Sequence, residues 1–196
     1  QASLQRRVVL RIAPATDSGA LGRFARAKAI ESKHAAKFFE LRNLADGRPY
    51  YVMEFVTGQS LAKMLAHGPL DITEAVDHVL EACEALSAAH VAGSLHRRLK
   101  TASLLLTNDR SGTSSIKVVG FATPGPTEKL GEMSTPAYRS PEQFTRSRKV
   151  DGQSDVWSLG VILYELLTAT NPFAAKTVAI TARHVIEQPV RRPTEL

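Results

Sequence analysis

The feature that most limits how this chain can fold is an apolar stretch near its C-terminal end. Residues 156–167 read Val-Trp-Ser-Leu-Gly-Val-Ile-Leu-Tyr-Glu-Leu-Leu, so apolar side chains would occupy almost every face of a helix. A helix that is apolar nearly all round belongs in the interior of a protein. The run is too short to cross a bilayer and carries Glu165. It therefore predicts a buried central helix, beginning at Ser154 or Asp155 and ending at Leu167.

The rest of the chain divides into a strand-rich first part and a helical remainder. Apolar and β-branched runs predict strands over residues 8–12, 38–42 and 49–56, the last two joined by a turn at Ala45-Asp46-Gly47. Between the first two we expect a basic helix over residues 20–36, capped by Asp17 or Ser18. A second hairpin is expected from residues 104–106 and 116–119. This order predicts an α+β fold with two unequal lobes.

A long amphipathic helix is predicted to follow Asp71, which with Glu74 forms a capping-box pattern. Gly93 is its expected C-terminal stop. The predicted apolar face, at helical spacing, comprises Ile72, Val76, Val79, Cys83, Leu86 and His90. Cys83 is the chain's one cysteine, so we expect a buried thiol, no internal disulfide and a reducing compartment.

Composition narrows the class of partner. The 196 residues are 43% hydrophobic and carry a formal net charge of +6, which would permit nucleic-acid binding. However, the arginines are dispersed and lack interleaved aromatic residues, so nucleic-acid binding is not expected. Direct membrane insertion is not expected either, because the longest apolar run is too short for a membrane span. We expect a cytoplasmic setting, including that of a cytoplasmic domain within a membrane protein.

Several short segments follow one another in a recognisable order. They are Tyr51–Val56, His96-Arg97-Arg98-Leu99-Lys100, Gly120-Phe121-Ala122, Thr135–Glu142 and Asp155–Leu167. This series resembles the eukaryotic-like Ser/Thr protein kinases of bacteria, with Met53 at the gatekeeper position before the hinge. The resemblance implies one protein-kinase-like domain over residues 1–196. Residues 1–56 would form a partial N-lobe, a truncated β-sheet plus one helix, with the hinge at 54–58. Residues 59–196 would form a partial, mainly α-helical C-lobe.

Both ends are expected to be incomplete relative to that family. The first strand corresponds to the one that carries the phosphate-anchoring lysine. We therefore expect the two preceding strands and their Gly-rich loop, and the last helices of the C-lobe, to be absent from this chain. Glu142 corresponds to a glutamate whose arginine partner would come from that C-terminal region.

The chain departs from the family at the positions that carry the chemistry. By resemblance, Arg98 replaces the hydroxyl-orienting aspartate, Gly120 the magnesium-binding aspartate and Ser103 the second metal ligand. Lys100 is retained, and Arg11 corresponds to the anchoring lysine. In the family, that lysine pairs with a glutamate from the following helix. Here Ala25 or Ala27 occupies the expected place of the glutamate, and Glu31 falls about two turns too late to replace it. Arginine is always protonated and cannot act as a base.

These departures predict a catalytically inactive pseudokinase that serves as a regulatory or scaffolding module. We expect no cofactor, with ATP binding weak or absent and no magnesium. The alternatives are a weak ATP-binding sensor and a residual Ser/Thr kinase that recruits Glu128 or Glu132 as a base. Nucleotide contacts, if made, would come from Val9, Arg11, Met53, Glu54, Val56 and Leu105, although the same side chains would also pack a dry core. His96 and Phe121 are expected to pack as part of a spine that joins the lobes.

The resemblance also implies partners and a mode of control. Regulatory proteins are expected, including an active Ser/Thr kinase and a forkhead-associated domain that reads phosphothreonine. Thr123 and Thr127 are the expected phosphorylation sites, with Arg97, Lys129 and Arg139 as basic neighbours.

Overall fold

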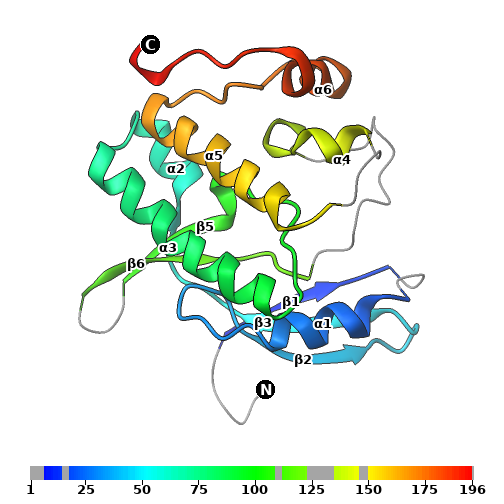
Figure 1. The fold of residues 1–196 in the computed structure, drawn as a ribbon. Coiled ribbons are helices and arrows are strands. Elements are labelled where there is room, and N and C mark those ends of the chain that lie inside the picture. Colours follow the sequence, from blue (N-terminus) through cyan, green and yellow to red (C-terminus); the bar gives the residue numbers. More distant parts are fainter. Residues whose placement is uncertain (1–6, 15–17, 109–111, 123–134, 146–149, 196) are drawn as a thin grey trace.

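A smaller and a larger lobe make up the chain (Figure 1). The structure is a computed structural model, and it describes residues 7–14, 18–108, 112–122, 135–145 and 150–195. The smaller lobe contains β1 (Val8–Ile12), α1 (Ala20–Lys28), β2 (Phe38–Asn43) and β3 (Pro49–Glu54). Its strands form an antiparallel sheet in the order β1-β3-β2. The strands and the hairpin predicted for this region are thereby confirmed.

Helices dominate the larger lobe, and a second small sheet lies between them and the smaller lobe (Figure 1). The strands of this sheet are β4 (Gln59–Ser60), β5 (Leu104–Asn108) and β6 (Ser114–Val118), in that order. The helices are α2 (Leu61–Met64), α3 (Ile72–Val91), α4 (Pro141–Thr145), α5 (Gly152–Thr168) and α6 (Val178–Glu187). Short 3-10 turns cover Leu65–His67, Thr101–Ser103, Pro136–Tyr138 and Pro193–Glu195. The α+β class and the two unequal lobes are confirmed.

Three aromatic rings hold α1 against the first sheet. The centroids of Phe24, Phe38 and Tyr51 lie 6.2–6.4 Å apart, and Tyr51 is fully buried. The Tyr51 hydroxyl also donates a hydrogen bond to the carbonyl of Ala20 at 3.4 Å. Full burial of a ring of this size contributes about 1.5–3 kcal/mol, so this cluster stabilises the packing of α1 on the sheet.

The prediction of a helix over residues 20–36 is wrong in its second half. Helix α1 ends at Lys28, and the chain then crosses to β6. There the Val118 amide donates to the carbonyl of His34 at 2.7 Å, and the Ala36 amide donates to Val118 at 2.9 Å. These bonds require an extended backbone, and residues this distant in sequence give no local signal of them. At the N-terminus of α1, Gly19 is the N-cap residue, so no side chain caps the helix by a hydrogen bond. The predicted cap Asp17 lies outside the described residues.

Helix α3 begins and ends as predicted, but its predicted buried face is confirmed only in part: Leu86 is buried and Val79 packs against the core, whereas Ile72, Val76 and Cys83 are exposed. The Asp71 carboxylate accepts from the Thr73 amide at 2.8 Å, and Gly93 follows the helix with a φ of +68°. The buried face consists of Ala75, His78, Ala82, Ala85, Leu86 and Ala89. Small alanine side chains let α3 approach α5 and β6 closely, whereas Cys83 and several larger apolar residues, Ile72, Val76, Leu80 and Val91, lie on the exposed side.

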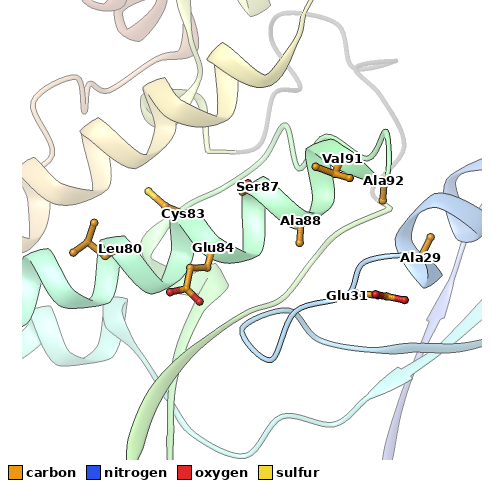
Figure 2. Close-up of a pocket in the computed structure, with 9 residues that line it drawn as sticks. All are labelled: Ala29, Glu31, Leu80, Cys83, Glu84, Ser87, Ala88, Val91 and Ala92. Carbon is orange, nitrogen blue, oxygen red and sulfur yellow. The ribbon is translucent and has the colours of Figure 1, made fainter.

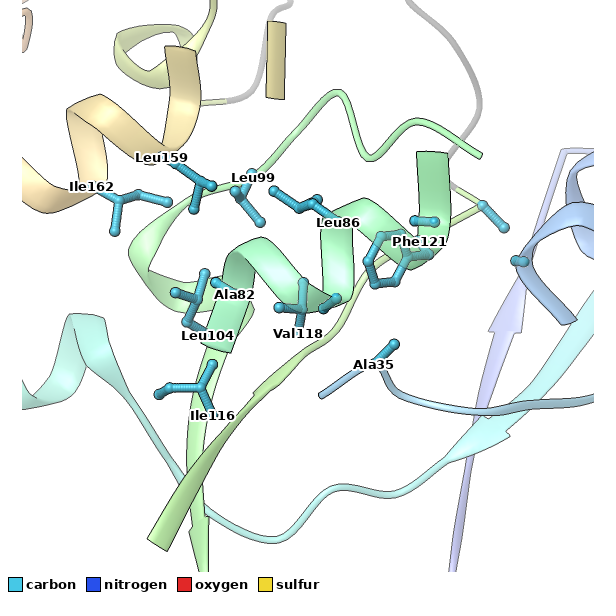
Figure 3. Packing of buried hydrophobic residues seen from close by; sticks show 14 of the residues in the cluster. Ala35, Ala82, Leu86, Leu99, Leu104, Ile116, Val118, Phe121, Leu159 and Ile162 are labelled. Atoms are coloured by element: carbon cyan, nitrogen blue, oxygen red, sulfur yellow. The ribbon is translucent and has the colours of Figure 1, made fainter. Parts of the chain in front are cut away.

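Helix α5 occupies the middle of the larger lobe. Its cap is Asp151, whose carboxylate accepts from the Gln153 amide at 2.9 Å, so the predicted start at Ser154 or Asp155 falls inside the helix. Figure 3 shows Leu159 and Ile162 of α5 directed toward α3 and β5. The expectation of burial nearly all round is wrong at Val156, which is 63% exposed. No helix among the described residues is long and apolar enough to span a membrane.

Candidate functional site

The loop from His96 to Lys100 is fastened to the central helix by one carboxylate. Asp155 is fully buried and accepts hydrogen bonds from the backbone amides of His96 at 2.9 Å and Arg97 at 2.7 Å. The oxygen that accepts from His96, Oδ2, also lies 2.8 Å from His90 Nε2. Burial by itself would raise the pKa of Asp155, but the His90 bond, the attraction of His96 and the two amides outweigh it and lower that pKa. The loop therefore rests on an ionised carboxylate.

The rings of His96 and Phe121 meet edge to face, as expected for a packing role. Both are buried, with centroids 5.0 Å apart at an interplanar angle of 70°. Burial is the main cause that lowers the pKa of His96, and its Nε2 donates to the carbonyl of Val119 at 3.0 Å. This ring pair joins the loop of residues 96–100 to the segment that follows β6, and its geometry is that of packing.

Gly120 takes a backbone conformation that suits glycine. Its φ is +100°, in the left-handed region that other residues rarely adopt. A Cβ atom added there would lie 3.5 Å from His96 Nε2, an ordinary contact distance. The obstacle to a side chain at position 120 is therefore the backbone angle rather than lack of space.

Three arginines lie close enough for their positive charges to repel one another. Burial lowers the pKa of Arg98, and repulsion from Arg139 and then Arg11 lowers it further. Burial also lowers the pKa of Arg139, whose side chain is 2% exposed. The pKa of Arg11 is lowered by burial first and by the nearby Arg23, against an opposing effect of Tyr51. Position 98 therefore carries a cation and no general base.

The segment from Lys100 to Ser103 is a 3-10 turn that holds Ser103 inside the structure. Ser103 is 7% exposed, its amide donates to the Lys100 carbonyl at 2.8 Å, and its carbonyl accepts from the Val119 amide at 2.9 Å. Lys100 itself is partly exposed. Ser103 and Gly120 are thus tied to neighbouring backbone, and together they offer one hydroxyl and no carboxylate.

The candidate nucleotide contacts come from both sheets. Val9 lies directly opposite Met53, and Arg11 opposite Tyr51, so these side chains share one face of the first sheet. The Glu54 carboxylate turns elsewhere, accepting from the Lys37 amide at 3.0 Å and pairing with Lys117 at 2.6 Å.

Two further candidates, Val56 and Leu105, are partly buried. Leu105 belongs to β5 and pairs with Ser60 and Lys117. An adenine held between Val9 and Leu105 stays a prediction.

Ala25, Ala27 and Glu31, which were compared with the glutamate that would pair with residue 11, differ in burial. Ala27 is 2% exposed and packs in the core, whereas Ala25 is exposed. Glu31 is exposed beyond the end of α1 and lines a groove beside α3 (Figure 2).

A polar network that sequence reasoning missed links the 101–103 turn to α5. The Tyr138 hydroxyl donates to Glu165 at 2.6 Å and lies 3.1 Å from the Thr101 hydroxyl. Burial is the largest cause that raises the pKa of both Tyr138 and Glu165. No local signal could have revealed these contacts, because the partners are far apart in sequence.

Two contacts of α4 also join residues that are distant in the sequence and give no local signal. Gln143 donates to the Arg97 carbonyl at 2.9 Å. Glu142, whose partner the sequence left unnamed, accepts from the Ser154 hydroxyl.

These features define the class of protein. A sheet-bearing lobe, a hinge, a helical lobe and a His-Arg-x-Leu-Lys loop fastened to a central helix make up a two-lobe, protein-kinase-like domain. The protein kinase domain family matches residues 27–195. The chain therefore belongs to the protein kinase family, among the eukaryotic-like Ser/Thr kinases of bacteria.

Individual relatives agree. Serine/threonine-protein kinase PknB of Mycobacterium leprae is 36% identical over 160 residues, which cover 77% of this chain and 25% of the relative. Serine/threonine-protein kinase pkn3 of Myxococcus xanthus is 31% identical over 208 residues, which cover 96% of this chain and 38% of the relative. A probable serine/threonine-protein kinase PknB of Corynebacterium glutamicum is 35% identical over 151 residues, which cover 72% of this chain and 23% of the relative. The chain spans about a quarter of the length of the PknB relatives.

Proposed function

We propose that this chain is a pseudokinase domain, which binds and presents surfaces without transferring phosphate. The observation that carries the proposal is Arg98, a cation at the position where the family places the carboxylate that orients the substrate hydroxyl. Phosphoryl transfer depends on positioning and on charge stabilisation by metal ions. A guanidinium beside two further arginines adds positive charge and cannot accept a proton.

The residues present do not fit the magnesium ions that the family uses. Magnesium favours near-octahedral oxygen ligands that include one or two carboxylates. Gly120 has no side chain and Ser103 supplies a single hydroxyl. In addition, no group of three His, Cys, Asp or Glu side chains in the described part of the chain is arranged to hold a metal.

The purified domain is expected to transfer no phosphate to itself or to generic basic substrates. Radiolabel incorporation from ATP is the measurement, with heat-denatured domain as the background. Incorporation above that background that disappears in a Lys100→Ala variant would favour the alternative of a residual Ser/Thr kinase, since Lys100 is the retained residue of the loop.

Nucleotide binding, if present, is expected to be weak and to change less than tenfold on adding magnesium. A single charge pair 4 Å apart is worth roughly 4 kcal/mol at an effective dielectric of 20, before desolvation is subtracted. Arg98 and Arg11 would thus replace part of the metal's charge, so Arg98→Gln is expected to weaken binding about fivefold and Arg98→Lys to change it little. Calorimetry with and without magnesium tests this. A tenfold or larger gain with magnesium would contradict it and support a functional metal site.

The role we propose is regulatory, in a cytoplasmic setting that includes the cytoplasmic part of a membrane protein. Its partners would be regulatory proteins, an active Ser/Thr kinase and a phosphothreonine-reading forkhead-associated domain. The favoured acceptors, Thr123 and Thr127, lie outside the described residues, as do Lys129, Glu128 and Glu132. A phosphate adds nearly two negative charges and strong acceptor oxygens, which such a domain can read.

Co-expression with a cognate Ser/Thr kinase is therefore expected to phosphorylate Thr123 or Thr127. Mass spectrometry of the intact domain and its peptides is the measurement, and a Thr123→Ala, Thr127→Ala double variant is the control. Phosphate found only outside residues 120–142 would reject both sites.

A further inference from the structure

The exposed side of α3 carries an apolar stripe along the whole helix. Ile72, Val76, Leu80, Cys83, Ser87 and Val91 recur at intervals of four or three residues. Four of them are exposed apolar side chains, at 69% for Ile72, 39% for Val76, 57% for Leu80 and 89% for Val91. Scattered apolar residues on a surface need no explanation, but a row of them on one helix face, interrupted here only by Ser87, is typical of an interaction surface. Nothing in the described part of the chain covers this row.

A groove runs beside the C-terminal half of the stripe. Its volume is about 910 Å³, and its walls are formed by α3 and by the segment after α1. Figure 2 shows Leu80, Cys83, Ser87 and Val91 on successive turns of α3, with Ala29 and Glu31 across from the end of the helix. The lined part of α3 is about 16 Å long at 1.5 Å per residue, which is the length of three helical turns. The shape suits an elongated, helical occupant.

Charge sets the chemistry of that occupant. Helix α3 carries Glu74, Asp77, Glu81 and Glu84 and neither lysine nor arginine, although the chain as a whole has a net charge of +6. Glu84 is 66% exposed at the groove, 3.3 Å from His34 Nε2, and the exposed Glu31 lies in the same groove. An apolar trough with an acidic rim matches an apolar face flanked by basic residues. Two copies packed α3 to α3 would instead place like charges together.

We propose that the α3 groove binds a basic amphipathic helix of a partner protein. The partner's apolar residues, at i, i+4 and i+7, would lie against Leu80, Cys83 and Val91, and its lysines or arginines would face Glu31 and Glu84. None of these groove residues is among the candidate nucleotide contacts. The surface therefore works whether or not the domain transfers phosphate, and its failure is distinguishable from failure of the pseudokinase proposal.

The test selects peptides from a phage-displayed library of helical sequences against the whole chain. The same chain alkylated at Cys83, its one cysteine, serves as counter-selection. Recovered peptides are expected to combine apolar residues at helical spacing with lysine or arginine at the flanks. Each is then synthesised with a fluorophore, and its affinity is measured by anisotropy at low and high salt.

Variants locate the binding site. Leu80→Glu is expected to weaken binding at least tenfold, and the double change Glu31→Gln, Glu84→Gln about fivefold with a smaller salt dependence. Val156→Glu, at a comparably exposed apolar residue on α5, is the matched control and should change affinity less than twofold. Thermal unfolding of each variant confirms that it is folded.

Cys83 provides a readout that needs no substitution. Burial raises the pKa of its thiol, so alkylation is slow and easily followed at one alkaline pH. Saturating peptide is expected to slow that alkylation at least tenfold. Acidic or uncharged selected peptides, unchanged Cys83 labelling, or binding unaffected by Leu80→Glu would overturn the proposal. So would dimerisation of the chain that Leu80→Glu abolishes, because the occupant would then be a second copy.

Discussion

Replacing Asp155 by alanine is expected to lower the free energy of unfolding by about 3–5 kcal/mol, the range for removing one partner from a buried charged network. The carboxylate is fully buried and accepts from two backbone amides and interacts with His90. Alanine would leave those groups buried without a partner. Small domains are stable by about 5–15 kcal/mol, so much of the stability would be lost. Urea denaturation of both proteins is the measurement.

Two matched variants distinguish the loss of the buried Asp155 network from the general effect of removing an aspartate. Asp155→Asn keeps one acceptor oxygen, so its cost should be about half as large. Asp151→Ala removes an exposed cap from the same helix, which costs about 1 kcal/mol. A loss below about 1 kcal/mol for Asp155→Ala would show that the loop is held by other contacts.

The contribution of Asp155 should also depend on pH in a defined direction. Its pKa is lowered in the folded chain, whereas an unfolded aspartate titrates near pH 3.9. A depressed carboxyl pKa gives stability that is fully present above the unfolded value and is lost as pH falls through the folded value. The difference in stability between the natural chain and Asp155→Ala should thus be constant from pH 7 to about pH 5. It should shrink progressively below about pH 4.

Restoring aspartate at Arg98 alone is expected to restore no phosphate transfer. The change would supply a proton acceptor, yet Gly120 and Ser103 would still offer magnesium no carboxylate. Loss of a single charged group in such sites commonly costs about 10³-fold or more in rate. Radiolabel incorporation by Arg98→Asp should remain at the denatured background. The minimum set is Arg98→Asp, Ser103→Asn and Gly120→Asp together. Turnover by the single variant would contradict the argument from the metal positions.

The triple variant meets an obstacle in the backbone. Any side chain at Gly120 must adopt a φ near +100°, which costs about 1–3 kcal/mol. Gly120→Ala should therefore destabilise the chain. Gly160→Ala, inside α5 with nothing within 4 Å of the added Cβ, should stabilise it by about 1 kcal/mol. Equal effects of the two changes would remove the strain argument.

The sequence by itself determined the fold class and the element order, and it is the sole basis for the predicted departures from the kinase pattern. Strands β1, β2 and β3, the cap at Asp71 and the stop at Gly93 are local signals, because each depends on residues within a few positions. The placement of Arg98, Gly120 and Ser103 likewise follows from spacing within intact motifs.

Only the tertiary structure decided which faces are buried and how the loops are held. The α1 segment stops at Lys28 because residues 34–36 bond to β6, and α3 turns its alanines inward because α5 and β6 approach closely. The same packing leaves Leu80, Cys83 and Val91 on the surface beside Glu31. Such contacts join residues tens of positions apart, and periodicity along one helix reports an apolar face without reporting what will pack against it.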